Sequence, residues 1–175
     1  MNRNTHARDT RAAGQPSATM HGGSTARAYW MFALNLALSL IPMYLAMFTM
    51  IDGWGDYRNN LNMLYMALTM LAPMGMIMLA TMSAMYGNKP LNLALYLGLA
   101  FLFAGSLFAT RSQALVDDKQ FIDSMIPHHS GAILMCREAR ITDPELRKLC
   151  DEIVKAQRAE ISQMEAISAR LRSRE

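Results

Sequence analysis

Hydrophobic and polar positions divide this chain into three parts, because long apolar runs without a charged residue lie between two polar ends. The uncharged runs are residues 28–51, 59–88 and 90–110. Each run reaches the roughly 20 residues that a helix needs to cross a bilayer. The pattern therefore predicts a membrane domain, residues 28–110, with three spans at about residues 28–51, 61–86 and 91–110.

The polar segment before the first run, residues 1–27, is rich in Thr, Ser, Gly, Ala and Arg. It has almost nothing apolar to bury, so we expect a disordered tail. It is a poor signal peptide, because the apolar run that follows is about 24 residues long and a signal peptide has 7–15. We expect the first span to be retained as an anchor.

Basic residues flank the three spans unequally. Four Arg precede the first span, the loop at residues 52–58 has one Arg against two Asp, and the second loop has only Lys89. The positive-inside rule places residues 1–27 in the cytoplasm, and three crossings then place residues 111–175 outside. In a bacterial inner membrane this last domain is periplasmic.

The polar segment after the spans, residues 111–175, has the apolar periodicity of helices. Asp117 and Gln120 resemble an N-cap and its partner, so we expect a helix from Asp117 to about Arg140. The apolar phase does not change at Pro127, which indicates a kink rather than a break.

A second helix is predicted to follow after a short turn. Asp143 or Thr142 is its expected N-cap, Pro144 suits the first turn, and the helix continues to about Arg172. Two helices with a short connection form an antiparallel hairpin. The predicted fold class is therefore all-α, with three transmembrane helices followed by a soluble two-helix hairpin.

Methionine is the unusual feature of the composition, with 17 in the chain. Seven of them recur at steps of three or four in the second run and should share one helix face: Met63, Met66, Met70, Met74, Met78, Met82 and Met85. We favour packing between helices, for which flexible thioethers are suited. The alternative is a thioether ladder that conducts Cu(I). The basic pI of about 9.0 comes from the Arg-rich ends and does not indicate nucleic acid.

Candidate metal ligands gather in the first predicted helix of the hairpin. At about 100° per residue, His128 and His129 lie on either side of Met125, so both imidazoles can lean toward one seam. Symmetry about the turn places Met164 of the second helix one turn from the position opposite Met125. Thioether and imidazole ligands suit copper, with Cu(I) favoured over Cu(II).

Two polar residues of the second helix face this cluster. The same symmetry places Gln157 opposite His129, within an otherwise apolar stripe, where an unpaired amide costs about 1–3 kcal/mol. We expect Gln157 and Glu160 to orient the imidazoles or to act as weak ligands. The competing interpretation is that the two histidines are exposed and bind no metal. Met135 and Ile161 are expected to be core residues.

The two cysteines, Cys136 and Cys150, fall opposite each other across the predicted turn. A disulfide would staple a hairpin with a small core. Free buried thiols and a second, thiolate copper site are the alternatives.

Two sequence blocks resemble the bacterial family known as domain of unknown function 305, over about residues 117–172. They are Phe121-Ile-Asp-Ser-Met-Ile-Pro-His-His-Ser-Gly-Ala-Ile-Leu-Met135 and Gln157-x-x-Glu160-x-x-x-Met164. Members of this family are similar to ferritin-like helical bundles, and some are associated with copper binding and tolerance outside the cytoplasm. The resemblance implies a metal site at Met125, His128, His129, Met135, Gln157, Glu160 and Met164.

The predicted hairpin is half of such a bundle, so a second copy of the chain or the membrane helices would complete the site. We expect a membrane-tethered periplasmic copper-binding module that serves copper buffering, tolerance or delivery. The alternatives are a Met-lined copper transporter and a helical structural or interaction module without metal. No enzyme is expected, because the sequence offers no nucleophile with a base and orienting group and no phosphate-binding loop.

Overall fold

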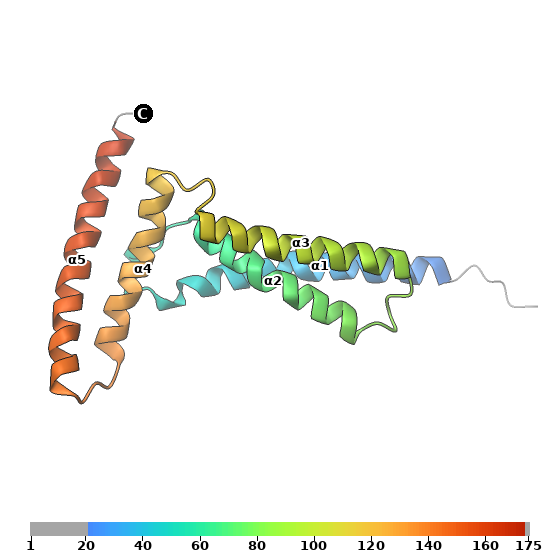
Figure 1. Cartoon of the computed structure of the whole chain (residues 1–175), viewed down its shortest axis with the longest axis horizontal. Helices are drawn as coiled ribbons and strands as arrows, with labels where there is room; N and C mark the ends of the chain where they lie inside the picture. Colours follow the sequence, from blue (N-terminus) through green and yellow to red (C-terminus); the bar gives the residue numbers. More distant parts are fainter. Residues whose placement is uncertain (1–20, 174–175) are drawn as a thin grey trace, which may run out of the picture.

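The computed structural model describes residues 21–173, and all regular elements in this range are helical. They are α1 (His21–Ala46), the 3₁₀ turns η1 (Met47–Met50) and η2 (Trp54–Asp56), α2 (Leu61–Thr81), α3 (Lys89–Ser112), α4 (Asp118–Glu138) and α5 (Pro144–Arg172). Figure 1 shows α1, α2 and α3 running along one direction, with the pair α4 and α5 lying across one end of them. The predicted all-α class is confirmed.

Three helices in the described range are long and apolar enough to cross a membrane, and they are α1, α2 and α3. α1 begins at His21, earlier than predicted, so residues 21–27 of the expected tail are helical. Helix propagation adds a backbone hydrogen bond per residue whatever the side chain, so a boundary drawn from charge and hydropathy falls too late. The remainder of the expected tail, residues 1–20, lies outside the described residues.

The membrane helices contact one another through small residues on α2. The buried side chains of α2 are Ala67, Leu71, Ala72 and Leu79, together with Gly75. A Cβ placed on Gly75 would lie 3.1 Å from Cδ1 of Leu99 on α3 and 3.2 Å from Cδ2 of Leu36 on α1. Gly75 therefore allows both neighbouring helices to approach α2 closely.

The methionine face of α2 is not this buried face. Met66 and Met70 are 44% and 41% exposed. α2 ends at Thr81, so Met82 and Met85 lie beyond the helix that was expected to carry them. Met78 does pack against the cluster of Phe32, Leu79, Tyr86 and Leu99. The methionines were expected to pack between the helices, whereas Ala, Leu and Gly form most of the α2 contact face. The reason is that close helix contact favours Ala and Gly over a long side chain.

The hairpin forms as predicted, with both caps in place. The Asp117 carboxylate accepts a hydrogen bond of 2.8 Å from the Gln120 backbone N–H, and Asp143 accepts one of 2.8 Å from Leu146 N–H. α4 continues through Pro127 as a single helix. Four isoleucines form the hairpin core: Ile122, Ile126, Ile133 and Ile161. The expectation that Ile161 is a core residue is thereby confirmed.

The hairpin is fixed to the first loop of the membrane domain by a residue pair on α4. The fully buried Ser130 hydroxyl accepts a 2.7 Å hydrogen bond from the Asp52 backbone N–H and donates one of 2.5 Å to Asp56 Oδ2. A Cβ on the neighbouring Gly131 would lie 3.1 Å from the Met50 carbonyl oxygen. Ser130 and Gly131 thus form the contact between α4 and the segment from η1 to η2.

Further polar contacts extend this junction toward both ends of α4. Arg137 Nη1 forms an ion pair with Asp52 Oδ1 at 2.6 Å, and the Gln120 side-chain oxygen accepts a 2.9 Å hydrogen bond from Leu61 N–H. The first loop and the hairpin therefore lie at the same end of the three membrane helices, as three crossings require. The start of α1 and the loop between α2 and α3 lie at the opposite end (Figure 1).

Candidate metal centre

His129 presents a largely buried imidazole on α4, with a side chain 12% exposed. Its Nδ1 lies 3.5 Å from Glu160 Oε2 of α5, but the contact lacks hydrogen-bond geometry, and this buried nitrogen has no hydrogen-bond partner in the described part of the chain. Burial lowers the pKa of His129 below its usual 6.5, although Glu160 opposes the shift. A neutral imidazole with a free nitrogen is the form that binds metal ions.

A second buried polar atom on the facing helix is also without a partner. Gln157 Oε1 is buried and accepts no hydrogen bond from the described residues. The expected pairing of Gln157 with His129 is thus not among the hydrogen bonds of the structure, and Glu160 is the residue beside the imidazole. Each buried polar atom without a partner costs about 1–3 kcal/mol, so α4 and α5 both carry polar groups that a ligand would stabilise.

His128 is exposed, and its ring centre lies 6.1 Å from that of His129. A metal ion binds an imidazole nitrogen at about 2 Å. An ion held between two such nitrogens would lie about 3 Å from each ring centre, so the observed separation fits one ion between both imidazoles.

The expected thioether ligands are placed differently from one another. Met125 is half-buried, and Met164 packs against the isoleucine core of the hairpin. Met135 is 59% exposed, so its expected place in the core is wrong, because its face of α4 is covered by neither α5 nor the membrane domain. Met135 also lies seven residues, about 10 Å along the helix, from His128.

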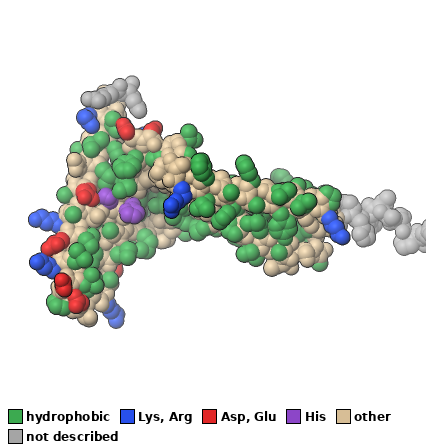
Figure 2. Space-filling model, viewed as in Figure 1, with side chains coloured by type: hydrophobic (Ala, Val, Ile, Leu, Met, Phe, Trp, Pro, Cys, Tyr) green, Lys and Arg blue, Asp and Glu red, His purple; other side chains and the backbone are tan. Residues whose placement is uncertain are grey.

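Residues 21–173 contain no group of three His, Cys, Asp or Glu side chains that could hold a metal ion. Figure 2 shows the histidine side chains on the surface of the hairpin, with hydrophobic side chains around them.

Cys136 and Cys150 form a disulfide, with a Cα separation of 5.3 Å. Of the three alternatives that the sequence left open, the structure selects the disulfide. The bond joins α4 and α5 near the turn of the hairpin, and neither sulfur is a thiolate ligand.

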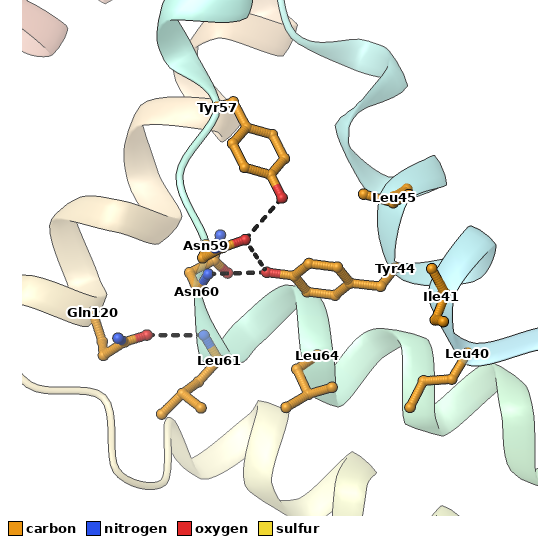
Figure 3. A pocket seen from close by; sticks show the side chains of 10 residues that line it. All are labelled: Leu40, Ile41, Tyr44, Leu45, Tyr57, Asn59, Asn60, Leu61, Leu64 and Gln120. Carbon is orange, nitrogen blue, oxygen red and sulfur yellow. Dashed lines mark hydrogen bonds between the residues drawn. The ribbon is translucent and has the colours of Figure 1, made fainter. Parts of the chain in front are cut away.

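A separate hollow of about 480 Å³ lies where α1, the first loop and α2 meet, and it contains none of the expected metal ligands. Figure 3 shows its polar end, where the Tyr44 and Tyr57 hydroxyls donate to Asn59 Oδ1 at 3.1 and 2.8 Å. Leucine and isoleucine side chains line the remainder. These hydrogen bonds shape the first loop, on which the hairpin rests.

The sequence alone did not identify Asp52, Asp56, Ser130 and Arg137 as residues that position the candidate site. Ser130 did carry a signal, since it stands directly after His129 inside the block Phe121–Met135, but the sequence of the block does not indicate its partner. Its partners lie more than 70 positions earlier in the chain.

Fold and site together define an all-helical protein with three apolar helices and a hairpin that carries two neighbouring histidines. The family described as Domain of unknown function (DUF305) matches residues 107–168. Uncharacterized protein L153 of Acanthamoeba polyphaga mimivirus is 32% identical over 140 residues, which cover 78% of this chain and 90% of the viral protein. No solved structure matches.

The chain therefore belongs to the family of this viral protein, and its hairpin is a DUF305 domain. The aligned 78% of the chain is longer than the segment from residue 107 to the end, so the similarity extends into the apolar helices.

Proposed function

We propose that this protein is a membrane-anchored copper-binding module that buffers or delivers copper, or protects against it, at the outer side of a bacterial inner membrane. One observation carries the proposal: the buried His129 Nδ1 has no hydrogen-bond partner among the described residues and lies beside His128 and Glu160. A desolvated nitrogen of this kind is stabilised when it binds a metal ion.

Copper is favoured by the kinds of candidate ligand that α4 and α5 carry. Imidazoles of His128 and His129 and the thioethers of Met125 and Met164 are borderline to soft ligands, and thioethers bias a site toward Cu(I). The Glu160 carboxylate would orient the His129 ring, and Gln157 Oε1 would be a further weak ligand or would accept a hydrogen bond from a ligand group.

Placement of the hairpin outside the cytoplasm rests on charge. Arg27 near the start of α1 and Lys89 at the start of α3 lie at one end of the membrane helices, and the hairpin lies at the other end (Figure 1). Three further Arg precede α1 in the sequence. The positive-inside rule assigns the first of these ends to the cytoplasm. The hairpin then corresponds to half of a ferritin-like bundle held at the periplasmic surface of the bilayer.

The alternative of a Met-lined transporter has less support. Met66 and Met70 of α2 are exposed on the outside of the three helices, and the α2 face that contacts α1 and α3 is made of Ala, Leu and Gly. A path along the methionines would therefore need another chain to enclose it. The remaining alternative is a hairpin that binds no metal, and a Cu(I) titration distinguishes it from the proposal.

The test is a titration of the full-length protein in detergent with Cu(I) against a competing chelator. We expect the His128→Ala/His129→Ala variant to lose at least tenfold in affinity, because both imidazoles are removed. Gln163→Ala, an exposed position on α5, is the matched control and should bind as the wild type does. Equal copper retention by the double variant, with helix content unchanged by circular dichroism, would exclude the proposal.

A further inference from the structure

Helix α4 has three faces, and two of them are covered. α5 packs on the face that contains Ile126 and Ile133, and the first loop of the membrane domain contacts the face that contains Ser130 and Gly131. On a helical wheel the third face is about 120° from both. In the described chain nothing covers it.

Apolar and metal-ligand side chains occupy this third face. Phe121 and Met135 are 53% and 59% exposed, His128 is exposed, and Met125 and Ala132 are half-buried. The five positions are spaced by four, three, four and three residues, which is the spacing of a helix seam that packs against another helix. We call these five residues the α4 stripe: Phe121, Met125, His128, Ala132 and Met135.

We propose that the α4 stripe binds the α4 stripe of a second copy of this chain, and that the pair of copies completes the metal site. The metal part of this inference rests on the proposed function. Within residues 21–173 of one chain, no three His, Cys, Asp or Glu side chains come together, and the exposed imidazole of His128 lies on the uncovered stripe. A second copy supplies the same ligands from the opposite side.

The membrane fixes how two copies meet. Copies anchored with the same orientation in one bilayer approach side by side, and a closed pair is related by a twofold axis along the membrane normal. α4 lies across the end of the spans (Figure 1), so this axis makes the two α4 helices antiparallel.

The stripe is centred on His128, which has two stripe residues on each side. An antiparallel pair about this centre brings the two His128 imidazoles together at the axis. Phe121 of each copy then packs against Met135 of the other. The helix dipoles agree with this order, because the start of one α4, capped by Asp117, comes near the end of the other.

Cysteine cross-linking tests both the interface and its direction. Phe121→Cys and Met135→Cys chains carrying different tags are co-expressed at full length, and the membranes are oxidised in the presence of a metal chelator. The native cysteines do not compete, because they are already joined. We expect a cross-link between the two kinds of chain that is at least tenfold stronger than between identical chains, while His128→Cys cross-links with itself.

Gln163→Cys, on the exposed side of α5, is the matched control and should not cross-link. A Phe121→Cys variant that links only to itself would overturn the antiparallel pair, and absence of links at all three stripe positions would overturn the interface. Because a chelator is present, the test does not depend on copper. If the variants cross-link as expected but the wild-type protein binds no Cu(I), the proposed function is contradicted and the interface is still supported.

Discussion

Ser130 on α4 accepts a hydrogen bond from the backbone N–H of Asp52, 78 positions earlier in the chain, at 2.7 Å. The same hydroxyl donates to the Asp56 carboxylate, so the residue directly after His129 anchors the hairpin to the membrane domain. Ser130, which lies in the same sequence block as the candidate ligands, therefore fixes their position relative to the membrane domain.

Ser130→Ala should loosen this anchor. The substitution leaves the Asp52 N–H and the Asp56 carboxylate without their partner, at a cost of about 1–3 kcal/mol. Hydrogen exchange at the Asp52 amide should become at least fivefold faster, while Ser162→Ala, at an exposed position of α5, should leave it unchanged. Equal exchange rates in both variants and the wild type would show that Ser130 does not hold the loop.

Gly131→Ala should weaken the same junction by sterics rather than by lost hydrogen bonding. The new Cβ would lie 3.1 Å from the Met50 carbonyl oxygen, so the loop or α4 must shift. The matched control is Gly98→Ala on α3, where a Cβ meets nothing within 4 Å. We expect a lower melting temperature for Gly131→Ala than for the wild type. Gly98→Ala should not lower the melting temperature, since Ala is the better helix former by about 1 kcal/mol. A melting temperature for Gly131→Ala at or above that of the wild type would contradict the close contact.

Removal of the disulfide should destabilise the hairpin more than it affects metal binding. Cys136 and Cys150 are separated by 14 positions, and closing a loop of that size contributes about 3 kcal/mol to stability. Cys136→Ser/Cys150→Ser should therefore melt at a lower temperature than the oxidised wild type. Dithiothreitol should lower the melting temperature of the wild type and leave that of the double variant unchanged. Cu(I) affinity of the folded variant should stay within threefold of the wild type. A tenfold loss of affinity would instead make the cysteines part of the site.

The lowered pKa of His129 predicts a direction of pH dependence. In the unfolded chain this imidazole gains a proton near pH 6.5, whereas burial keeps it neutral in the folded protein at lower pH. The unfolded state thus binds more protons just below pH 6.5, and stability falls as pH decreases from 6.5 toward the folded pKa. Cu(I) affinity should change little between pH 7.5 and 6.5 and decline below that, since protons then compete for Nδ1.

Two measurements check this direction. The His129 imidazole resonances, followed by NMR, should titrate with a midpoint below 6.5. His129→Gln should reduce the loss of stability between pH 6.5 and 5.5. A midpoint above 6.5 would mean that the nearby Glu160 carboxylate outweighs burial, and affinity would then decline already above pH 6.5.

Features with a local or periodic origin were predictable from the sequence. Uncharged runs located the membrane helices, and Asp117 and Asp143 marked the helix starts because an N-cap acts within three residues. Symmetry about the turn paired Cys136 with Cys150, which the structure joins.

Features that depend on what covers a helix face were not predictable in this way. Periodicity places Met135 on a face of α4 but does not say that this face lacks a neighbour. The contact of Ser130 with Asp52 joins segments with no common pattern. Gln157 Oε1 forms no hydrogen bond with His129, while Glu160 Oε2 lies 3.5 Å from its Nδ1, because the rotation of the two helices about their axes decides the pairing and spacing alone leaves that rotation free.

X-ray absorption at the copper edge of the full-length, Cu(I)-loaded protein tests whether the hairpin binds copper through its histidines and methionines. We expect imidazole nitrogen at about 2.0 Å together with sulfur at about 2.3 Å, the distances typical of such ligands. We also expect the imidazole scattering to be lost in His128→Ala/His129→Ala. A ligand shell of oxygen alone, or a spectrum that the double substitution leaves unchanged, would contradict copper binding at this cluster.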